Sequence, residues 1–301
     1  MKHFTLPKEG GLVEKNIPSD ILHSYEKIRT EIYDQSTTAS EVIADEIIDS
    51  INACQGRTFR LGLSTGVTPV SLYKWLTRKY QEGKVSFSNV EVYSIDEYYP
   101  YGKGEPQSRN SILHNSLRNA VDIKEENIHL PDGSVPEDKI TAYCEEYDKM
   151  VRGLDMLVIG MGEMAQVGFN EAGTSPVSRT RTVLLSYQSR KRQGKNFNGD
   201  FKHTPSQAIT IGIDTMMSAK KIVLMAWGED KANAVKHVCE CNPDYEYPAS
   251  LLQGHQNICC YVDETAGSLL TRVVSPWLVG PCDWTRKFIR KAVVWLCQEV
   301  H

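Results

Sequence analysis

The chain has 301 residues, of which 41% are hydrophobic and 24% are charged, and its formal net charge is −4. These fractions are typical of a water-soluble globular protein, and the slightly acidic balance excludes the broad basic surface of a nucleic-acid-binding domain. The eight cysteines include no CxxC pair, so we expect reduced thiols rather than a zinc site or a disulfide framework.

The N-terminal segment does not have the composition of a targeting signal. Residues 1–16 are charged and interrupted by Pro7 and by Gly10 and Gly11, and no long apolar span follows anywhere in the chain. The sequence therefore predicts neither a signal peptide nor a membrane segment. We expect a cytoplasmic protein that acts on a small molecule, with no nucleic-acid or membrane partner.

Four short apolar runs, taken in chain order, each end in a polar cluster. The runs and their clusters are 58–63 before 64–69, 90–94 before 96–98, 154–159 before 160–171, and 221–227 before 228–231. Near-continuous runs of Val, Ile and Leu are typical of buried parallel strands. Because open α/β sheets bind ligands beyond the carboxyl ends of their strands, we expect the four clusters to meet in one cleft.

Helical periodicity alternates with these runs. It predicts helices over 40–54, 69–80, 108–119, 137–151 and 230–241, and further strands are expected at 181–185, 208–213 and 258–262. Alternation of this kind implies right-handed crossovers. The sequence therefore predicts an α/β fold: a doubly wound, mostly parallel sheet with helices on both faces.

No linker or composition break divides the chain, so a single domain over residues 1–301 is expected. Its least certain part is the N-terminal segment 1–38. A last amphipathic helix, at about 284–300, is predicted to bury Phe288, Ile289, Val293 and Leu296.

The first polar cluster has the composition of a phosphate-binding loop. Thr65, Gly66 and Thr68 lie between a strand and a helix that starts near Pro69, so amide N–H groups and the helix dipole would face an anion. Lys231, at the start of another helix, could supply a cation to the same phosphate. A plain turn before a capped helix and a solvated surface lysine would produce the same patterns.

Two of the clusters contain carboxylates suited to proton transfer. Asp96 and Glu97 follow one predicted strand, where a partly desolvated acid could serve as a base, and Glu171 follows a glycine-rich loop. The alternative for Asp96 and Glu97 is a solvated acidic turn. Two carboxylates beside a phosphate site suggest aldose-ketose chemistry on a sugar phosphate.

The motifs occur in a familiar order. They are LGLSTGVTP at 61–69, IDEY at 95–98, GMG followed by VGFNE within 160–171, SRTR at 178–181, AITIGI at 208–213 and GxxK at 228–231. Together, over about residues 40–265, they resemble the glucosamine-6-phosphate deaminase/isomerase family. The resemblance implies an amino-sugar phosphate as substrate, no metal and no organic cofactor for catalysis, and a potential for homo-oligomers.

The resemblance also implies roles for individual residues. Asp96 matches the base at the substrate C2, and Glu171 matches the acid that supports a ring-opening histidine. The other matches are the phosphate-binding set Thr65, Gly66, Thr68 and Lys231, and the candidate substrate contacts Glu97 and Arg181.

One loop departs from the family pattern, which reads Gly-x-Gly-x-Asp-Gly-His. Here the aspartate is replaced by Met164 and the histidine by Gln166. Glutamine can orient a hydroxyl but cannot exchange a proton near neutral pH. The first hypothesis is therefore a glucosamine-6-phosphate deaminase of reduced activity. The alternatives are a catalytically impaired sugar-phosphate-binding protein and a 6-phosphogluconolactonase-like hydrolase, which would also need the missing histidine.

Overall fold

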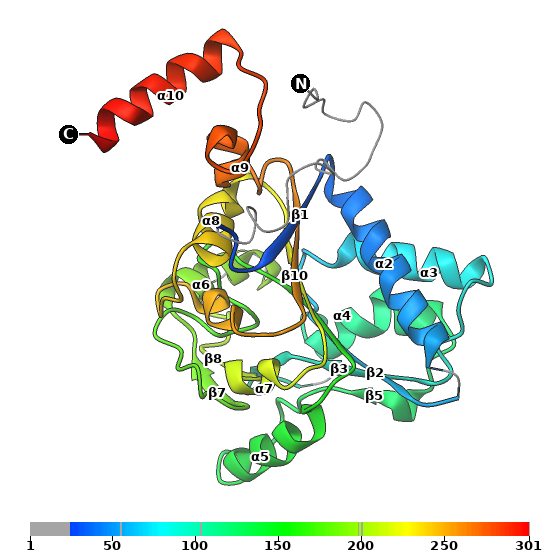
Figure 1. Ribbon diagram of the computed structural model, residues 1–301. Helices are drawn as coiled ribbons and strands as arrows, with labels where there is room; N and C mark the ends of the chain where they lie inside the picture. Colours follow the sequence, from blue (N-terminus) through cyan, green and yellow to red (C-terminus); the bar gives the residue numbers. More distant parts are fainter. Residues whose placement is uncertain (1–24, 55, 103, 198, 200, 301) are drawn as a thin grey trace.

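A seven-stranded sheet lies at the centre of the molecule, with the strand order β1-β10-β9-β6-β2-β3-β5 (Figure 1). The computed structural model describes residues 25–54, 56–102, 104–197, 199 and 201–300. The strands of this sheet are β1 (Arg29–Tyr33), β2 (Phe59–Leu63), β3 (Val90–Ser94), β5 (Ile128–His129), β6 (Met156–Gly160), β9 (Ile222–Ala226) and β10 (Ile258–Asp263). Every pairing between them is parallel.

Helices cover both faces of this sheet (Figure 1). On one face lie α2 (Ser36–Ala53), α3 (Val70–Gln81) and α4 (Arg109–Ser116), and on the other α5 (Ile140–Val151), α7 (Ile213–Met217) and α8 (Ala232–Glu240). The packing of strand β6 on both of its faces explains why its sequence is apolar throughout. Met156 and Val158 pack in the core under α2 and α3, whereas Leu157 and Ile159 pack in the core under α5 and α8. The predicted doubly wound α/β fold is confirmed.

The N-terminal segment 1–38 is described only from residue 25 onward. Within it, β1 pairs with β10, and α2 begins at Ser36. The sequence did not predict β1, which extends the sheet beyond the four strands recognised from their apolar runs. The prediction for residues 1–24 lies outside the described residues.

A second, antiparallel sheet of three strands stands beside the first, in the order β4-β8-β7. Its strands are β4 (Asp96–Tyr99), β8 (Gln207–Thr210) and β7 (Arg181–Leu184). Ile95 marks the change between the sheets, because its N–H donates to Leu63 O (3.3 Å) and its carbonyl accepts from Ile211 N (2.9 Å). Asp96 and Glu97 therefore lie on a buried strand, and the alternative of a solvated acidic turn was wrong.

The C-terminal helix α10 (Arg286–Glu299) projects from the body of the molecule (Figure 1). The prediction that it buries its apolar face was wrong: Ile289 is 47% exposed, Val293 56% and Leu296 55%. Phe288 alone of the predicted four contacts an aromatic ring outside the helix, that of Trp277, with ring centroids 6.1 Å apart. Amphipathic spacing identifies the apolar face of a helix but not what covers it.

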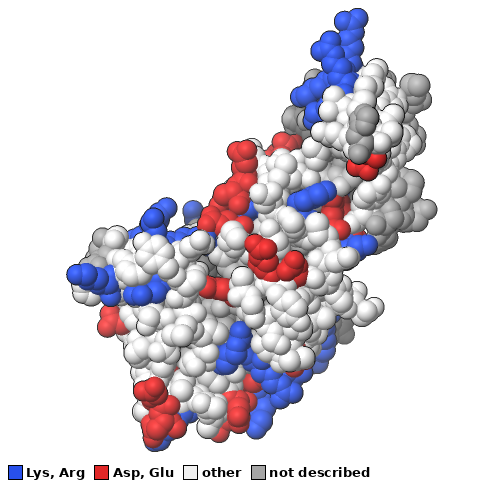
Figure 2. Space-filling view, turned by 90° about the vertical axis from the view of Figure 1, so that its left-hand side faces the viewer, with Lys and Arg blue, Asp and Glu red and all other residues white. Residues whose placement is uncertain are grey.

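Basic residues gather at the projecting end of the molecule (Figure 2). In α10, Arg286, Lys287, Arg290 and Lys291 occupy the first half of the helix. Over the rest of the face seen in Figure 2, basic and acidic side chains are interspersed. None of the helices in the described ranges is both long and apolar enough to cross a bilayer.

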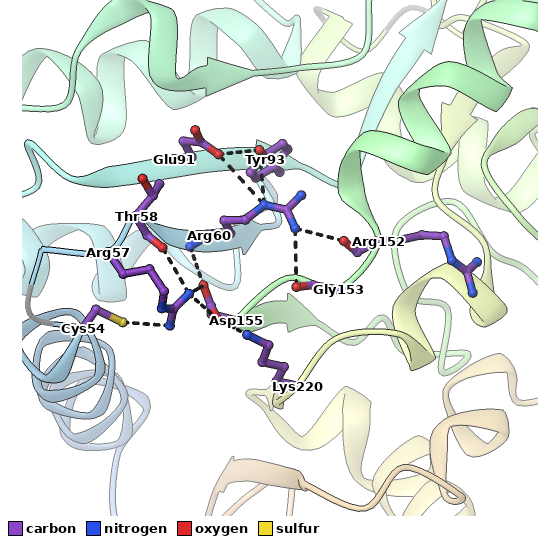
Figure 3. A network of polar contacts seen from close by, with 10 residues as sticks. All are labelled: Cys54, Arg57, Thr58, Arg60, Glu91, Tyr93, Arg152, Gly153, Asp155 and Lys220. Atoms are coloured by element: carbon purple, nitrogen blue, oxygen red, sulfur yellow. Dashed lines mark hydrogen bonds and ion pairs between the residues drawn. The ribbon is translucent and has the colours of Figure 1, made fainter.

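A polar network joins β2, β6 and the end of α5 at the amino edge of the sheet (Figure 3). Asp155 accepts hydrogen bonds from Arg57 Nη1 (2.9 Å), Arg60 N (2.9 Å) and Lys220 Nζ (2.7 Å). Arg60 in turn donates to the carbonyl of Arg152 at 3.0 Å. Burial opposes ionisation of Asp155, but the hydrogen bonds from Arg57 and Lys220 outweigh it and lower its pKa to about 2.

Candidate active site

The four apolar runs recognised in the sequence are four adjacent strands, β9, β6, β2 and β3. Because they are parallel, the polar segments that follow them all leave the sheet at its carboxyl edge. This is the edge at which doubly wound sheets bind their ligands. The candidate site is therefore formed by four consecutive strand ends.

The loop after β2 is joined to its neighbours by hydrogen bonds between side chains and the backbone. Gly160 N donates to Ser64 Oγ (3.1 Å), and the indole of Trp227 donates to the carbonyl of Thr68 (3.0 Å). These contacts join the ends of β6 and β9 to the loop. The Thr65 hydroxyl is buried and has no hydrogen-bond partner among the described residues. A Cβ added to Gly66 would meet no atom within 4 Å, so the loop has both a free hydroxyl and open space beside it.

Lys231 lies two strands away from this loop, in the 3-10 turn Glu229–Lys231 that follows β9. Its side chain is 17% exposed, and its ammonium forms an ion pair with Asp230. Gly228 begins the turn with φ +92°, a backbone conformation that favours glycine. The turn thus holds a partly buried cation near the carboxyl edge.

Asp96 is the first residue of β4 and is only 4% exposed. Its Oδ1 lies 3.2 Å from Nε of Arg109. Burial raises the pKa of Asp96 above its ordinary value, and the charge of Arg109 acts in the opposite direction. A Cβ added to Gly168, which has φ +58°, would lie 3.5 Å from Asp96 Oδ2 and 2.8 Å from Thr210 Oγ1. The turn at Gly168 therefore passes close to the second carboxylate oxygen.

Glu97 is directed toward the first turn of α4. Its Oε1 accepts from Tyr98 N (2.8 Å) and Arg109 N (3.0 Å), and its Oε2 accepts from Asn110 N (3.2 Å). Burial raises the pKa of Glu97 to about 7 in spite of these hydrogen bonds. Because backbone amides occupy both oxygens, Glu97 anchors α4, and the expected substrate contact finds no support in this geometry.

The loop that departs from the family pattern is closed by its own hydrogen bonds. Gly162 N donates to the Gln166 carbonyl (2.9 Å), and Met164 N donates to Gln166 Oε1 (2.9 Å). Ala165 adopts φ +55°, a left-handed conformation uncommon for alanine, at the position where the family pattern has glycine. The Gln166 side chain therefore supports its own loop.

Glu171 follows Asn170 in the chain, and Arg181 contacts the Asn170 side chain. Glu171 Oε2 accepts from Ser186 N (3.1 Å), while its Oε1 is buried and has no hydrogen-bond partner among the described residues. Arg181 Nη1 donates to Asn170 Oδ1 (3.1 Å), and burial lowers the pKa of this arginine. Glu171, which the family pattern pairs with a histidine, thus has one oxygen without a hydrogen-bond partner among the described residues.

Three histidines of the described ranges make contacts outside the Gln166 loop. His129 stacks on Tyr93, with centroids 4.6 Å apart, and His237 stacks on Tyr247 at 4.1 Å. His255 Nε2 lies 2.7 Å from the carbonyl of Ala219. None of these three rings takes the place of Gln166. Within the described ranges, no cluster of three or more His, Cys, Asp or Glu side chains could hold a metal ion.

Arg109 was not recognised from the sequence. It lies inside the predicted helix 108–119, where an arginine is usually a solvated surface residue, and no motif pointed to it. The guanidinium of Arg109 reaches Asp96 because helix α4 packs against strand β4.

Known proteins are similar to this chain in sequence and in fold. Residues 34–167, which include the loop after β2, Asp96 and Gln166, match the sequence model of the family described as glucosamine-6-phosphate isomerases/6-phosphogluconolactonase. A glucosamine-6-phosphate deaminase-like protein of Bacteroides thetaiotaomicron is 39% identical over 290 residues. The match covers 95% of this chain, which spans only 44% of that longer relative.

Shorter relatives are matched over most of their length. Glucosamine-6-phosphate deaminase 2 of Bacillus subtilis is 38% identical over 214 residues, covering 70% of this chain and 85% of the relative. A solved structure described as a monomeric glucosamine-6-phosphate deaminase superposes with a TM-score of 0.77 at 31% identity, covering 80% of this chain and all of that one. The 6-phosphogluconolactonase of Leishmania guyanensis shares the fold, with a TM-score of 0.64 at 17% identity. The chain therefore belongs to the glucosamine-6-phosphate deaminase/isomerase family.

Proposed function

We propose that this protein converts glucosamine 6-phosphate into fructose 6-phosphate and ammonia. The observation that carries the proposal is Asp96, a buried carboxylate ion-paired at 3.2 Å and placed at the same sheet edge as the loop after β2 and Lys231. A base and a phosphate site at one edge are what an aldose-ketose reaction on a sugar phosphate requires. Family membership supports the same substrate class.

The amide groups of the loop, the Thr65 hydroxyl and Lys231 would bind the phosphate, with Gly66 and Thr68 shaping the loop. Asp96 would then remove the C2 proton of the open-chain sugar, and a proton would return at C1. The resulting iminium at C2 would take up water and release ammonia, leaving the ketone. Each step moves only protons, one water molecule and the amine, so no redox cofactor is needed.

Ring opening is the step that Gln166 makes difficult. A histidine at this position would exchange protons with the ring oxygen, whereas Gln166 Oε1 already accepts from Met164 N at 2.9 Å. This observation favours a second candidate function, a protein that binds the sugar phosphate but turns it over slowly or not at all. Arg181 would assist binding in either case, through its contact with Asn170.

The two functions are separated by measuring turnover and binding on the same preparation. Ammonia release and fructose 6-phosphate formation from glucosamine 6-phosphate would be assayed with 6-phosphogluconolactone as a comparison substrate. We expect equimolar ammonia and fructose 6-phosphate, and no lactone hydrolysis. Calorimetric binding of glucosamine 6-phosphate without either product would support the binding protein instead, and lactone hydrolysis alone would contradict both.

We further propose a cytoplasmic location and a role in amino-sugar catabolism. Eight cysteines without the spacing of a disulfide framework are typical of a reducing compartment. Deaminase activity recovered in the cytosolic fraction of the source cells, and not among secreted or membrane proteins, would support this location. Whether copies of the chain associate is tested by light scattering on the purified protein.

A further inference from the structure

Arg109 is a buried cation that meets the candidate base from another element. It is the first residue of α4, and its guanidinium carbon lies 4.9 Å from the ring centroid of Tyr98 and 5.2 Å from that of Phe169. Its Nε lies 3.2 Å from Asp96 Oδ1 in an ion pair that lacks hydrogen-bond alignment, and the two side chains are 7% and 6% exposed. Two rings and one carboxylate therefore fix the guanidinium.

The backbone of Arg109 is fixed as well. Glu97 accepts hydrogen bonds from the N–H groups of Arg109 (3.0 Å) and Asn110 (3.2 Å), and Ser108 caps the helix by accepting from Ser111 N (3.0 Å). Glu97, which follows the candidate base Asp96 in the chain, thus anchors helix α4, which carries Arg109. A side chain held at both ends loses little conformational freedom when it orients another group.

Other titratable groups also face Asp96. Tyr73 from α3 and Tyr147 from α5 are both buried, and burial raises the pKa of each well above its ordinary value, so both stay neutral. Tyr98 lies on β4 itself, and burial raises its pKa too. Glu97 turns its carboxylate to α4. Of the described residues, Arg109 is the cation that contacts Asp96.

The two oxygens of Asp96 have different surroundings. Oδ1 contacts Arg109, whereas Oδ2 faces the turn at Gly168, where only glycine fits because a Cβ would lie 2.8 Å from Thr210 Oγ1. We propose that Arg109 is a positioning residue for Asp96: its charge faces Oδ1, it leaves Oδ2 to meet the substrate C2 proton, and it favours the ionised form of the buried carboxylate. This inference rests on the proposed deaminase function for its kinetic consequence, but the state of the Asp96 carboxyl group does not depend on turnover.

Removing the charge would leave a buried carboxylate without a counter-ion, and such a group takes up a proton instead. Three variants test this, with kcat and KM measured from about pH 5 to pH 9: Arg109→Gln, Arg109→Lys, and Arg118→Gln as a matched control. Arg118 forms an ion pair with Glu125, away from Asp96. All would first be checked for folding by circular dichroism.

For Arg109→Gln we expect the acid limb of kcat/KM to move up by at least about one pH unit. The loss should approach tenfold or more at pH values below the acid limb of the parent and be recovered at alkaline pH, with KM for glucosamine 6-phosphate changed less than twofold. For Arg109→Lys, which keeps the charge but not the planar geometry, the limb should move much less while kcat falls at every pH. Arg118→Gln should behave as the parent does.

A second readout does not require turnover. The protein labelled with ¹³C at aspartate Cγ would be titrated by NMR, and the Asp96 signal identified by its loss in Asp96→Asn. We expect that signal to titrate at higher pH in Arg109→Gln than in the parent. If Arg109→Gln does not fold, Arg109→Lys is titrated instead. We then expect the Asp96 carboxyl group to titrate as it does in the parent, while kcat is reduced.

Two results would overturn the inference. The first is an Asp96 carboxyl group whose titration is the same in the parent and in Arg109→Gln, or, where that variant does not fold, a kcat in Arg109→Lys equal to that of the parent. The second is a loss of rate by one factor across the whole pH range in Arg109→Gln, which would indicate a structural role only. If the parent has no deaminase activity but the Asp96 titration still moves to higher pH in Arg109→Gln, the proposed function is contradicted. The role of Arg109 is then still supported.

Discussion

The side chain of Gln166 completes a small hydrogen-bonded loop of its own. The backbone carbonyl of Gln166 accepts a hydrogen bond from Gly162 N, and its side-chain oxygen accepts one from Met164 N, both at 2.9 Å. The sequence identified the exchange of histidine for glutamine, but it could not say where the new side chain would point. The structure shows that Glu171, which the family pattern pairs with the histidine, has one buried oxygen without a hydrogen-bond partner among the described residues.

Restoring the family loop should therefore raise turnover. In Gln166→His combined with Met164→Asp, the imidazole would have the free Glu171 oxygen as its acceptor. General acid-base catalysis typically contributes about 10²- to 10⁴-fold. We expect kcat for glucosamine 6-phosphate to rise by at least tenfold, with a new pH dependence near the pKa of histidine, measured at saturating substrate.

The matched control is Gln166→Asn with Met164→Asp, which lacks a titratable group at residue 166. It should show no gain. A parent that is already as fast as the double variant would mean that another residue opens the sugar ring.

Lys231 provides a test of binding that is separate from catalysis. Losing one charge-assisted contact to a phosphate typically costs about 1.5 to 3 kcal/mol, which is roughly ten- to a hundredfold in affinity. Lys231→Ala should weaken calorimetric binding of glucosamine 6-phosphate by this factor, whereas Lys74→Ala, an exposed lysine on α3, should not. Equal affinities in the two variants would remove Lys231 from the phosphate site.

At the scale of secondary-structure elements, Asp155 joins the amino ends of β2 and β6 (Figure 3). Its carboxylate is 6% exposed, and hydrogen bonds from Arg57 and Lys220 lower its pKa to about 2 in the folded protein. Because the pKa of Asp155 is lower in the folded state than in the unfolded state, where it is about 4, the ionised carboxylate stabilises the fold at pH values above about 4. This contribution is lost as the pH falls toward 2. The network thus ties the sheet together at the edge opposite the candidate site.

Asp155→Asn should lower the free energy of unfolding by about 2 kcal/mol at pH 7, because the folded protein stabilises the ionised Asp155 carboxylate relative to the unfolded chain. The difference from the parent should shrink steadily below about pH 4. Urea unfolding at several pH values between 7 and 3 measures it. A difference that stays the same at pH 3 would show that lost packing, and not the ionised carboxylate, is responsible.

Elements with strong periodicity were predictable, and elements defined by tertiary contacts were not. The runs that became β2, β3, β6 and β9 are apolar on both faces because both faces of the sheet are covered. Strand β4 contains Asp96 and Glu97, which have low strand propensity, and it forms only because β8 supplies the pairing. The apolar face of α10 was visible in the sequence, but its exposure was not.

At the scale of the whole molecule, the rule that ligands bind at the carboxyl ends of parallel strands gave the location of the candidate site. The motifs added Thr65, Asp96, Glu171 and Lys231 to that edge. Arg109 could not be predicted in this way, because its position depends on how α4 returns across β4, and nothing in its own sequence neighbourhood marks it. Glu97 was visible as an acid next to Asp96, but its direction toward α4 was not.

The central claim is that Asp96 removes the C2 proton of an amino-sugar phosphate. It is tested most directly with glucosamine 6-phosphate deuterated at C2, incubated in ordinary water with the parent or with Asp96→Asn and followed by NMR and by ammonia release. We expect the parent to remove the deuterium from C2 as it forms ammonia and fructose 6-phosphate, and we expect Asp96→Asn, while still binding the sugar phosphate, to do neither. Loss of C2 deuterium at the same rate in both proteins would contradict it.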